Sequence, residues 1–343
     1  MSASDRHSRQ RLFAPIGSAG QARIENARIA IIGCGALGSH SAEMLARAGV
    51  ARTTRGVLRI IDRDYVDLSN LQRQALFDQS DAERSKPKAV AAADHIRAID
   101  CDCRVEAVVR DFNSSNAAEL LEDVDLVVDG TDNYQTRFTI NDAAVAAARP
   151  WIYGGAVASR GIVSFVEPGV TPCFRCLMGE IPPLGSGESC ETAGIITPLP
   201  ALVSALQVAA ALRWIAVGTY ESGVLRFDVW TGTFRRTLTT AARNPDCRSC
   251  GTRELPSLAA SAEHLVTLCG RNSVQLFWDV PVSLDAAERR FSSAGLVVHR
   301  HAQSVTTEFS EGKLTLFSDG RVIVEGTTDP LEAKSIVGRR LGG

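Results

Sequence analysis

Two apolar segments that flank a glycine-rich turn constrain the fold of this chain most strongly. The first, 28–32, leads into GCGALG at 33–38, and the second, 57–61, ends at Asp62. Between them, SHSAEMLARAGV has its apolar residues at helical spacing, and the polar, basic segment 51–55 is expected to be a solvated loop. A strand, a helix and a second strand in this order predict a β-α-β unit with parallel strands.

The same alternation continues toward the middle of the chain. It is typical of an α/β fold with a doubly wound, mostly parallel, Rossmann-like sheet. The predicted helices and strands are a helix at 86–99, a strand at 104–109, a helix at 116–121, a strand at 124–129, a helix at 137–148, strands at 151–155 and 161–167, a buried helix at 200–217 and a hairpin of 224–229 with 233–240.

The character of the sequence changes after Gly251. The later segments predict a small α+β unit with an Asp-Gly turn between two strands. We therefore expect two domains, 1–251 with the glycine-rich turn and 252–343. The predicted elements of the second domain are a strand at 273–278, a helix at 284–294, a strand at 296–301, two strands within 313–326 and a helix at 330–340.

Polar residues gather at and behind the end of the second predicted strand. A glycine-rich turn lets backbone N–H groups at a helix N-terminus approach phosphate, and Asp62 stands where a carboxylate usually accepts ribose hydroxyls. The run IDRDYVDLSNLQRQ adds Asp64, Asn70, Arg73 and Gln74. An enzyme that binds NAD has no need of an arginine and an asparagine there, whereas a site that holds a triphosphate does.

Two lysines and an aspartate extend this polar group. The segment SKPKA carries Lys86 and Lys88, and GTDN at 130–133 places Asp132 just past a predicted strand. Carboxylates at such strand ends face the ligand crevice of a doubly wound sheet. With cationic side chains nearby, Asp132 is better suited to hold Mg²⁺ than to act as a base. The alternative is a set of surface ion pairs around a loop.

Nine cysteines make an odd number, which argues against a disulfide framework and favours a reducing cytoplasm. Four of them form two CxxC pairs, Cys173 with Cys176 and Cys247 with Cys250. Such pairs can supply four thiolates to a tetrahedral, structural Zn²⁺ that pins two distant segments together. Two redox pairs or free thiols are the alternative interpretation.

These motifs together resemble one protein family. RHSRQ, GCGALGS, DxDxVxxSNLQRQ, PKA, GTDN, the CxxC pairs and SCETAG occur here in the order found in the ThiF/MoeB/HesA adenylyltransferases, which are bacterial relatives of ubiquitin-activating enzymes. The resemblance covers about residues 6–251. It implies an enzyme that uses ATP and Mg²⁺ to adenylate the C-terminal glycine of a small ubiquitin-like sulfur carrier ending in Gly-Gly. Such an enzyme would release pyrophosphate, work as a homodimer and serve thiamine or molybdopterin biosynthesis.

The resemblance also implies roles for single residues. Asn70, Arg73 and Lys88 would hold phosphates, and Asp132 would hold magnesium. Arg9 would reach into the site of the partner subunit as an arginine finger. The expected nucleotide site comprises Gly33, Gly35, Ala36, Gly38, Asp62, Asp64, Asn70, Arg73, Gln74, Lys88, Asp132 and Asn133.

Cys190 stands apart from the paired cysteines. It lies in the polar loop GSGESCETAG, where thiamine-type and eukaryotic molybdopterin-type members of the family have a cysteine that links covalently to the carrier. We therefore expect Cys190 to be catalytic in a transfer step, with an inert structural thiol as the alternative. The C-terminal domain has no rhodanese-type loop, so we expect a separate protein to donate the sulfur.

Composition limits the remaining possibilities. Lys and Arg number 37 and Asp and Glu 39, a net charge of −2, so nucleic acid is not an expected partner. The N-terminus has no apolar stretch of signal-peptide type, and the uncharged run 192–212 is interpreted as a loop and a buried helix rather than a membrane span. Two other functions stay open, an NAD(P)-dependent oxidoreductase and a non-catalytic scaffold of the same fold.

Overall fold

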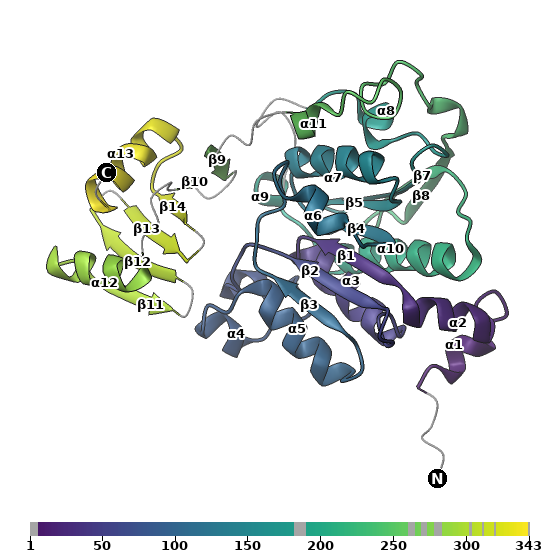
Figure 1. The fold of residues 1–343 in the computed structure, drawn as a ribbon, viewed down its shortest axis with the longest axis horizontal. Coiled ribbons are helices and arrows are strands. Elements are labelled where there is room, and N and C mark those ends of the chain that lie inside the picture. The colour runs from purple at the N-terminus through teal and green to yellow at the C-terminus, as the bar shows by residue number, and fades with distance from the viewer. Residues whose placement is uncertain are drawn as a thin grey trace, which may run out of the picture. The chain divides into compact units, whose positions relative to one another are not determined.

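The chain divides into two compact units, Met1–Ser261 and Ala262–Gly343 (Figure 1). The structure is a computed structural model that describes residues 6–181, 190–259, 265–268, 273–277, 283–301, 304–310, 312–318 and 320–341. The division falls somewhat later than the boundary after Gly251 that the sequence suggests. Residues just past that point belong to the first unit because Ser257, in α11 (Pro256–Ala259), donates its backbone N–H to Asp142 at 2.8 Å.

An eight-stranded sheet with the order β3-β2-β1-β4-β5-β6-β7-β8 forms the centre of the first unit. Neighbours from β3 to β5 are parallel, and those from β5 to β8 are antiparallel. The central strand β4 is buried throughout, as is usual for parallel strands covered on both faces. This is the doubly wound sheet that the sequence predicts. The strands are β1 (Arg28–Ile32), β2 (Val57–Ile61), β3 (Val105–Val108), β4 (Leu126–Asp129), β5 (Trp151–Val157), β6 (Arg160–Val166), β7 (Gly223–Asp228) and β8 (Thr233–Leu238).

Helices cover both faces of this sheet (Figure 1). On one face, α3, α5 and α10 enclose a core that includes Ile31 and Leu45. On the other face, α6 and α7 enclose a second core that includes Ile32 and Phe138. Ile31 and Ile32 belong to different cores because successive strand residues point to opposite faces. These helices are α3 (Ala36–Arg47), α5 (Lys88–Ile99), α6 (Ala117–Leu121), α7 (Tyr134–Ala147) and α10 (Pro198–Val217).

The long apolar helix α10 is a core helix with a few exposed positions. By length and composition it could cross a membrane, since its mean hydropathy is 1.6 over the most apolar stretch. It packs instead on β5 and β6 and against α2 (Gly17–Asn26) and α3. Half of that apolar stretch is fully buried, and Leu202, Leu206, Leu212 and Trp214 are partly buried against the same core, so that mainly Ala209, Arg213 and Val217 are exposed.

The segment 51–55 is only partly the solvated loop that its polarity suggests, because Thr54 and Arg55 are exposed but the residues before them are held by the fold. Ala51 is fully buried with a φ of +62°. Arg52 Nη1 lies 2.8 Å from Oδ2 of Asp100, whose side chain is only 1% exposed. The hydroxyl of Thr53 donates to Asn26 at 2.8 Å. A buried carboxylate needs a cationic partner, and this need fixes the loop in place.

Short helices of the first unit escaped the sequence analysis because one helical turn shows no repeating apolar period. Two of them, α8 and α9, interrupt the segment 172–194 that the sequence presents as a long loop. The short helices are α1 (Ser8–Leu12), η1 (Leu68–Asn70), α4 (Gln79–Glu83), α8 (Phe174–Met178), α9 (Cys190–Ala193) and η2 (Thr240–Ala242).

The second unit is a six-stranded antiparallel sheet with helices, as the α+β prediction requires. Its core includes Leu316, Val324 and Phe291. Strand β12 was not predicted because its sequence, SVTTEF, is too polar to show an apolar run. The elements are β9 (Leu265–Leu268), β10 (Ser273–Phe277), α12 (Leu284–Ser293), β11 (Val298–His301), β12 (Ser304–Phe309), β13 (Gly312–Phe317), β14 (Arg321–Glu325) and α13 (Pro330–Leu341).

Candidate functional site

The glycine-rich turn connects the end of β1 to the start of α3. Gly33 has a φ of +84°, and a Cβ at Gly38 would overlap the carbonyl oxygen of Gly33. α3 begins at Ala36, and among the described residues no side chain caps this helix at Gly35. Backbone N–H groups at an uncapped helix N-terminus are donors for phosphate, and the helix dipole favours an anion there.

Asp62 lies at the end of β2, directly beside this turn. Its side chain is buried, and it accepts hydrogen bonds from the backbone N–H groups of Cys34 at 2.5 Å and Asp64 at 2.6 Å. Burial raises the pKa of Asp62, and the ammonium group of Lys88 opposes that rise. The carboxylate therefore sits in a fixed position between the turn and the next segment, where a ribose hydroxyl could reach it.

The two lysines of SKPKA have different surroundings. Lys88 is 5% exposed, and its Nζ lies 3.3 Å from Oδ2 of Asp64. Lys86 is turned toward the neighbouring helices, because its Nζ lies 2.8 Å from Asp94 and 3.5 Å from Asp81. Only Lys88 is therefore placed with Asp62 and Asp64 beside the glycine-rich turn. We call this edge of the sheet, where the phosphates and ribose of a nucleotide are expected, the nucleotide end.

The segment after Asp62 uses part of its polar groups to hold its own backbone. Asp67 caps η1, and the side-chain oxygen of Asn70 completes the capping box by accepting from the N–H of Asp67 at 3.2 Å. Arg73 donates to the carbonyl of Ser69 at 2.9 Å. Gln74 is buried, and its side-chain oxygen has no hydrogen-bond partner among the described residues. These contacts place the side chains of 70–74 while leaving further donors for a ligand.

The loop 130–133 follows β4 and lies against the glycine-rich turn. Gly130 donates its N–H to Ile32 at 2.8 Å, and a Cβ at Gly130 would overlap the carbonyl oxygen of Gly33. The next residue but one, Asp132, is exposed, and within the described part of the chain its carboxylate makes no hydrogen bond or ion pair. Asn133 accepts from the N–H of Thr136 at 2.8 Å and caps α7.

Arg63, just past β2, and Asp111, just past β3, are two charged residues that were not predicted from the sequence. Arg63 Nη1 lies 3.0 Å from Oδ1 of Asp111, and the nearby charges of Asp64 and Asp132 also act on the guanidinium. Burial alone would lower the pKa of Arg63, but these carboxylates raise it above its ordinary value. Arg63 was overlooked because it occupies a variable position of DxDxV, and only the fold places it beside the end of β3.

Four sulfur atoms from distant segments meet beside α7. The Sγ of Cys173 lies 3.6 Å from that of Cys247, and the Sγ of Cys176 lies 3.4 Å from that of Cys250. All four sulfurs lie within 4.8 Å of one another. A tetrahedral zinc with Zn–S bonds of about 2.3 Å separates its sulfur ligands by about 3.8 Å, so the cluster fits such an ion.

Two residues of α7 anchor the segments that carry these cysteines. Asn141 accepts from the N–H of Phe174 at 2.8 Å. Asp142 accepts from the hydroxyl of Ser249 at 2.5 Å and from the N–H of Ser257 at 2.8 Å. The cysteine cluster and the nucleotide end are therefore built on the same helix, about two turns apart.

Arg9 lies far from the other predicted site residues. Its neighbour Gln10 donates to the carbonyl of Ala48 at 2.9 Å and to Gln21 at 2.7 Å, so α1 is docked at the C-terminal end of α3. The glycine-rich turn is at the other end of α3, about 18 Å away along the helix. Arg9 itself is exposed and forms no hydrogen bond or ion pair with the described residues.

The remaining cysteines differ in exposure. Cys34 is fully buried in the glycine-rich turn, and burial raises the pKa of its thiol well above the usual range. Burial raises the pKa of Cys103 to about 12, whereas Cys101 is exposed. Cys190 is the first residue of α9, but its side chain and the loop 182–189 before it lie outside the described residues. Cys269 lies outside them as well.

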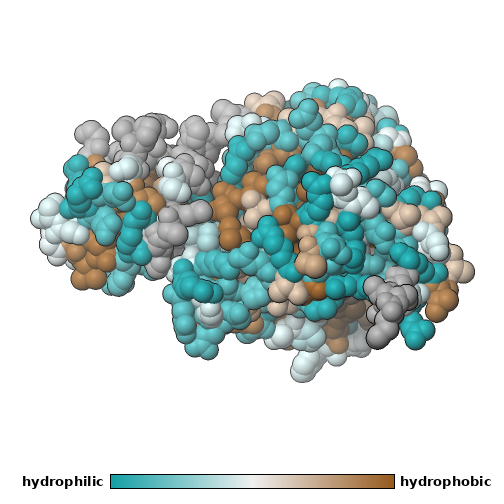
Figure 2. All heavy atoms as spheres, turned by 60° about the horizontal axis from the view of Figure 1, so that its bottom comes forward, coloured by the Kyte–Doolittle hydropathy of each residue, from teal (hydrophilic) through white to brown (hydrophobic). Residues whose placement is uncertain are grey.

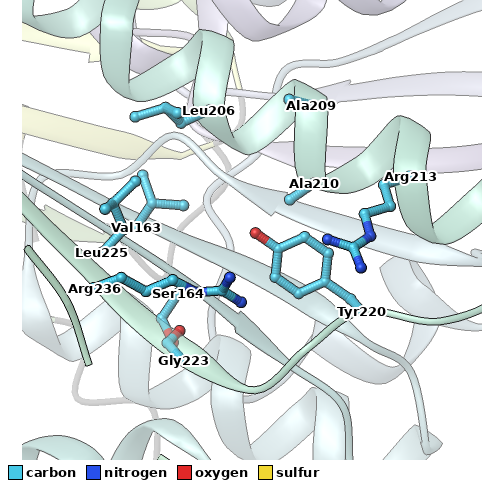
Figure 3. A pocket seen from close by; sticks show the side chains of 10 residues that line it. All are labelled: Val163, Ser164, Leu206, Ala209, Ala210, Arg213, Tyr220, Gly223, Leu225 and Arg236. Atoms are coloured by element: carbon cyan, nitrogen blue, oxygen red, sulfur yellow. The ribbon is translucent and has the colours of Figure 1, made fainter. Parts of the chain in front are cut away.

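A cavity of about 260 Å³ lies at a different place, between α10 and strands β6 and β7. Figure 3 shows the Tyr220 ring beneath α10 with the guanidinium of Arg213 beside it. Leu206, which is partly buried against the core, and the exposed Ala209 line the cavity from α10. None of its lining residues belongs to the predicted nucleotide site.

Comparisons with known proteins agree with this architecture. The model of the ThiF family matches residues 7–249. The sulfur carrier protein ThiS adenylyltransferase of Bacillus subtilis is 41% identical over 340 residues, which are 98% of this chain and 99% of that protein. The sulfur carrier protein adenylyltransferase of Thermus thermophilus is 37% identical, and the match covers 72% of this chain and 90% of that protein.

A solved structure supports the fold. The crystal structure of E. coli MccB with ATP is 22% identical and superimposes with a TM-score of 0.61 over 73% of this chain and 75% of that one. At this identity the likeness concerns the fold alone. With the family match over residues 7–249 and a relative of the same length, the chain belongs to the ThiF family.

Proposed function

We propose that this chain is an adenylyltransferase that uses ATP to activate the C-terminal glycine of a small sulfur-carrier protein. The observation that carries the proposal is the arrangement on one sheet edge of an uncapped helix N-terminus, the buried Lys88 and the unpaired Asp132. The relatives supply the substrate class, since both are named for a sulfur carrier. The B. subtilis relative is named for ThiS, so a ThiS-like carrier of thiamine biosynthesis is the first to test, ahead of a molybdopterin-type carrier.

The chemistry asks for charge stabilisation and positioning rather than for a base. The terminal carboxylate of the carrier is already ionised at neutral pH and attacks the α-phosphate of ATP in line, and the bond to pyrophosphate breaks. In this proposal Asp62 holds the ribose, and the N–H groups of α3 with Asn70, Arg73 and Lys88 hold the phosphates. Mg²⁺, which Asp132 would bind, neutralises charge on the phosphate oxygens.

Family membership favours this function over an NAD(P)-dependent oxidoreductase. The cationic side chains of Arg73 and Lys88 at the nucleotide end suit a triphosphate, whereas hydride transfer needs neither. A non-catalytic scaffold of the same fold would have no need to keep Asp132 exposed and unpaired beside an open phosphate turn.

Zinc is the ion that best fits the four cysteines. Four thiolates complete a tetrahedral coordination shell and leave no open position, so the ion would be structural rather than catalytic. It would join α8 to residues 247–250 and thereby hold the segments that α7 anchors through Asn141 and Asp142. Free thiols of this kind persist in a reducing compartment, which agrees with the proposed cytoplasmic location.

We further propose that the active form is a homodimer. The outward side of α10, the cavity beside it and β8 form one continuous candidate surface, because β8 follows β7 in the sheet. All six residues of β8 are exposed, including Phe234 and Leu238 at 56% and 59%. Figure 2 shows that hydrophobic side chains gather in separate patches on a mostly hydrophilic face. Ala209, Arg213 and Val217 of α10 are exposed beside this surface, and a partner bound there would cover them.

A second copy of the chain is the partner that also completes the site. The start of α10 lies near the glycine-rich turn, because Ser204 donates to the carbonyl of Leu37 at 2.8 Å. Its other end lies near α1 and α2, because Arg23 donates to the carbonyl of Ile215 at 3.2 Å. A two-fold axis that pairs two copies of α10 in opposite directions would bring α1 of each subunit toward the glycine-rich turn of the other. Arg9 would then reach the phosphates of its partner.

The first test concerns magnesium and the phosphate site. Asp132→Ala should abolish carrier-dependent ATP–pyrophosphate exchange without loss of the fold, and Arg73→Ala should slow it about 10²-fold, the scale for one charge-stabilising group. Glu122→Ala removes an exposed carboxylate after α6 and serves as the matched control. Near-normal exchange by Asp132→Ala would show that the magnesium site lies elsewhere.

The second test concerns zinc. The purified chain should hold one zinc ion that survives dialysis, and Cys173→Ser or Cys247→Ser should lower the melting temperature and the solubility, because the ion contributes directly to folding. Cys101→Ser changes an exposed cysteine outside the cluster and should leave both unchanged. Metal analysis well below one zinc per chain would contradict the assignment.

The third test concerns assembly. Arg9→Ala and Asp132→Ala chains should each be inactive, but their mixture should recover about a quarter of the wild-type exchange, because half of the dimers are mixed and each has one intact site. Arg9→Ala mixed with the Arg9→Ala/Asp132→Ala double variant should recover nothing. An absence of recovery in the first mixture, with subunit exchange demonstrated, would exclude a contribution of Arg9 in trans.

The fourth test concerns Cys190, for which we propose a transfer role after adenylation. Its thiolate would attack the mixed anhydride of the carrier and release AMP, a good leaving group. Cys190→Ser should therefore leave ATP–pyrophosphate exchange unchanged but remove any thiol-sensitive covalent complex with the carrier and slow sulfur transfer. Cys101→Ser is again the control. Sulfur transfer at the full rate in Cys190→Ser would make this cysteine a bystander.

A further inference from the structure

A buried ion pair lies directly beneath the loop that carries Asp132. Asp129, the last residue of β4, is 0% exposed, and Arg137, one turn into α7, is 7% exposed. Arg137 Nε donates to Oδ2 of Asp129 at 3.1 Å. Neither residue belongs to the nucleotide site expected from the sequence.

Both members of the pair bind the backbone of this loop. Arg137 Nη2 donates to the carbonyl of Thr131 at 2.5 Å, and Oδ1 of Asp129 accepts from the N–H of Thr131 at 2.9 Å. The Thr131 hydroxyl donates to the same oxygen at 2.6 Å. The peptide groups on both sides of Thr131 are thus held, and the second of them leads directly into Asp132.

Two further contacts tie the pair to elements outside the loop. Arg137 Nη2 donates to the carbonyl of Gly154 in β5 at 3.1 Å. Gln207 in α10 donates to the backbone carbonyl of Asp129 at 2.8 Å. The support of the loop is therefore rigid on the side of the sheet as well as on the side of α7.

Hydrogen bonds to this backbone fix the loop that carries Asp132, and the charges of Arg63 and Arg137 also act on its carboxylate. Within the described part of the chain no side chain contacts its carboxylate by a hydrogen bond or ion pair. The positive charge of Arg137 is matched by Asp129, so Arg137 can hold the loop without occupying the carboxylate that a cation would bind. A buried ion pair adds little net stability over apolar side chains, whereas these donors and acceptors fix one short loop in a single geometry.

We propose that Arg137 is a positioning residue that, with Asp129, sets the direction of the Asp132 carboxylate for a divalent cation bound together with ATP. The inference rests on the proposed function of the site, and it adds a residue that acts through the loop rather than on the nucleotide. A purely structural role of Arg137 is the competing explanation. It would lower stability without a specific effect on the cation.

The experiment compares nucleotide binding with and without the cation. In Arg137→Lys, the affinity for ATP in the presence of Mg²⁺ should fall about 10- to 100-fold, the scale of a misplaced catalytic group, while the affinity in EDTA should change little. Arg175→Lys is the matched control, because Arg175 is a second buried arginine, 6% exposed, that donates to Ser249 beside the cysteine cluster. It should alter the melting temperature but not the magnesium dependence.

Two further measurements keep the outcome decisive. In an Asp132→Asn background, Arg137→Lys should have no additional effect on ATP binding, because the group that it positions no longer binds the cation. Should Arg137→Lys not fold, Thr131→Val removes one contact of the same loop and should weaken binding in Mg²⁺ selectively. Equal losses in Mg²⁺ and EDTA, an unchanged magnesium dependence, or an additive loss in Asp132→Asn would overturn the proposal.

This experiment also separates the inference from the function on which it rests. Carrier-dependent ATP–pyrophosphate exchange by the wild-type chain tests the function alone. Exchange by the wild type combined with an unaltered magnesium dependence in Arg137→Lys would reject the positioning role and keep the function. Magnesium-dependent ATP binding without any exchange would reject the adenylation, while the Arg137→Lys comparison would still decide the role of the pair.

Discussion

The nucleotide end depends on a close approach of three glycine backbones. Gly33 takes a positive φ at the end of β1, and neither Gly38 in α3 nor Gly130 after β4 leaves space for a Cβ beside it. This contact brings the start of α3 and the loop of Asp132 to the same point, where in the proposed function phosphate donors and a carboxylate for the cation would face one ligand. Any side chain in this position would push α3 or the loop away and separate the two halves of the site.

Helix α7 links the nucleotide end to the cysteine cluster. Its cap, Asn133, follows Asp132 directly, its second turn holds Arg137 beneath the loop, and its third holds Asn141 and Asp142, which bind the cysteine-bearing segments. One helix is thus tied to the loop of Asp132 near its start and to the cysteine-bearing segments at its middle. A structural zinc would therefore matter to the nucleotide end through the position of α7, although four thiolates leave it no part in the chemistry.

The sequence predicted the strands next to the glycine turn with the bounds that the structure shows, because Arg28–Ile32 and Val57–Ile61 are apolar except for one arginine each. It also placed Lys88 and Asp132 at one edge of the sheet, since strand ends of a doubly wound fold converge. It could not separate Lys88 from Lys86, because only the fold turns Lys86 toward Asp94. Arg137 was missed for a similar reason. The spacing of apolar residues along a helix does not show that one of its polar side chains folds back under the preceding loop.

Hydrogen bonds within the chain distinguish the side chains that support the candidate site from those that are available to contact a ligand. The side-chain oxygens of Asn133 and Asp62 accept from backbone N–H groups, and those of Asp129 accept from Thr131 and from the guanidinium of Arg137. Asp132 and Arg9 are exposed and lack such partners among the described residues. A preorganised site keeps its supporting groups bound before the ligand arrives and leaves open only those that the ligand will meet. Asp132 and Arg9 lie at opposite ends of α3, so in the proposed dimer they would meet one ligand from different subunits.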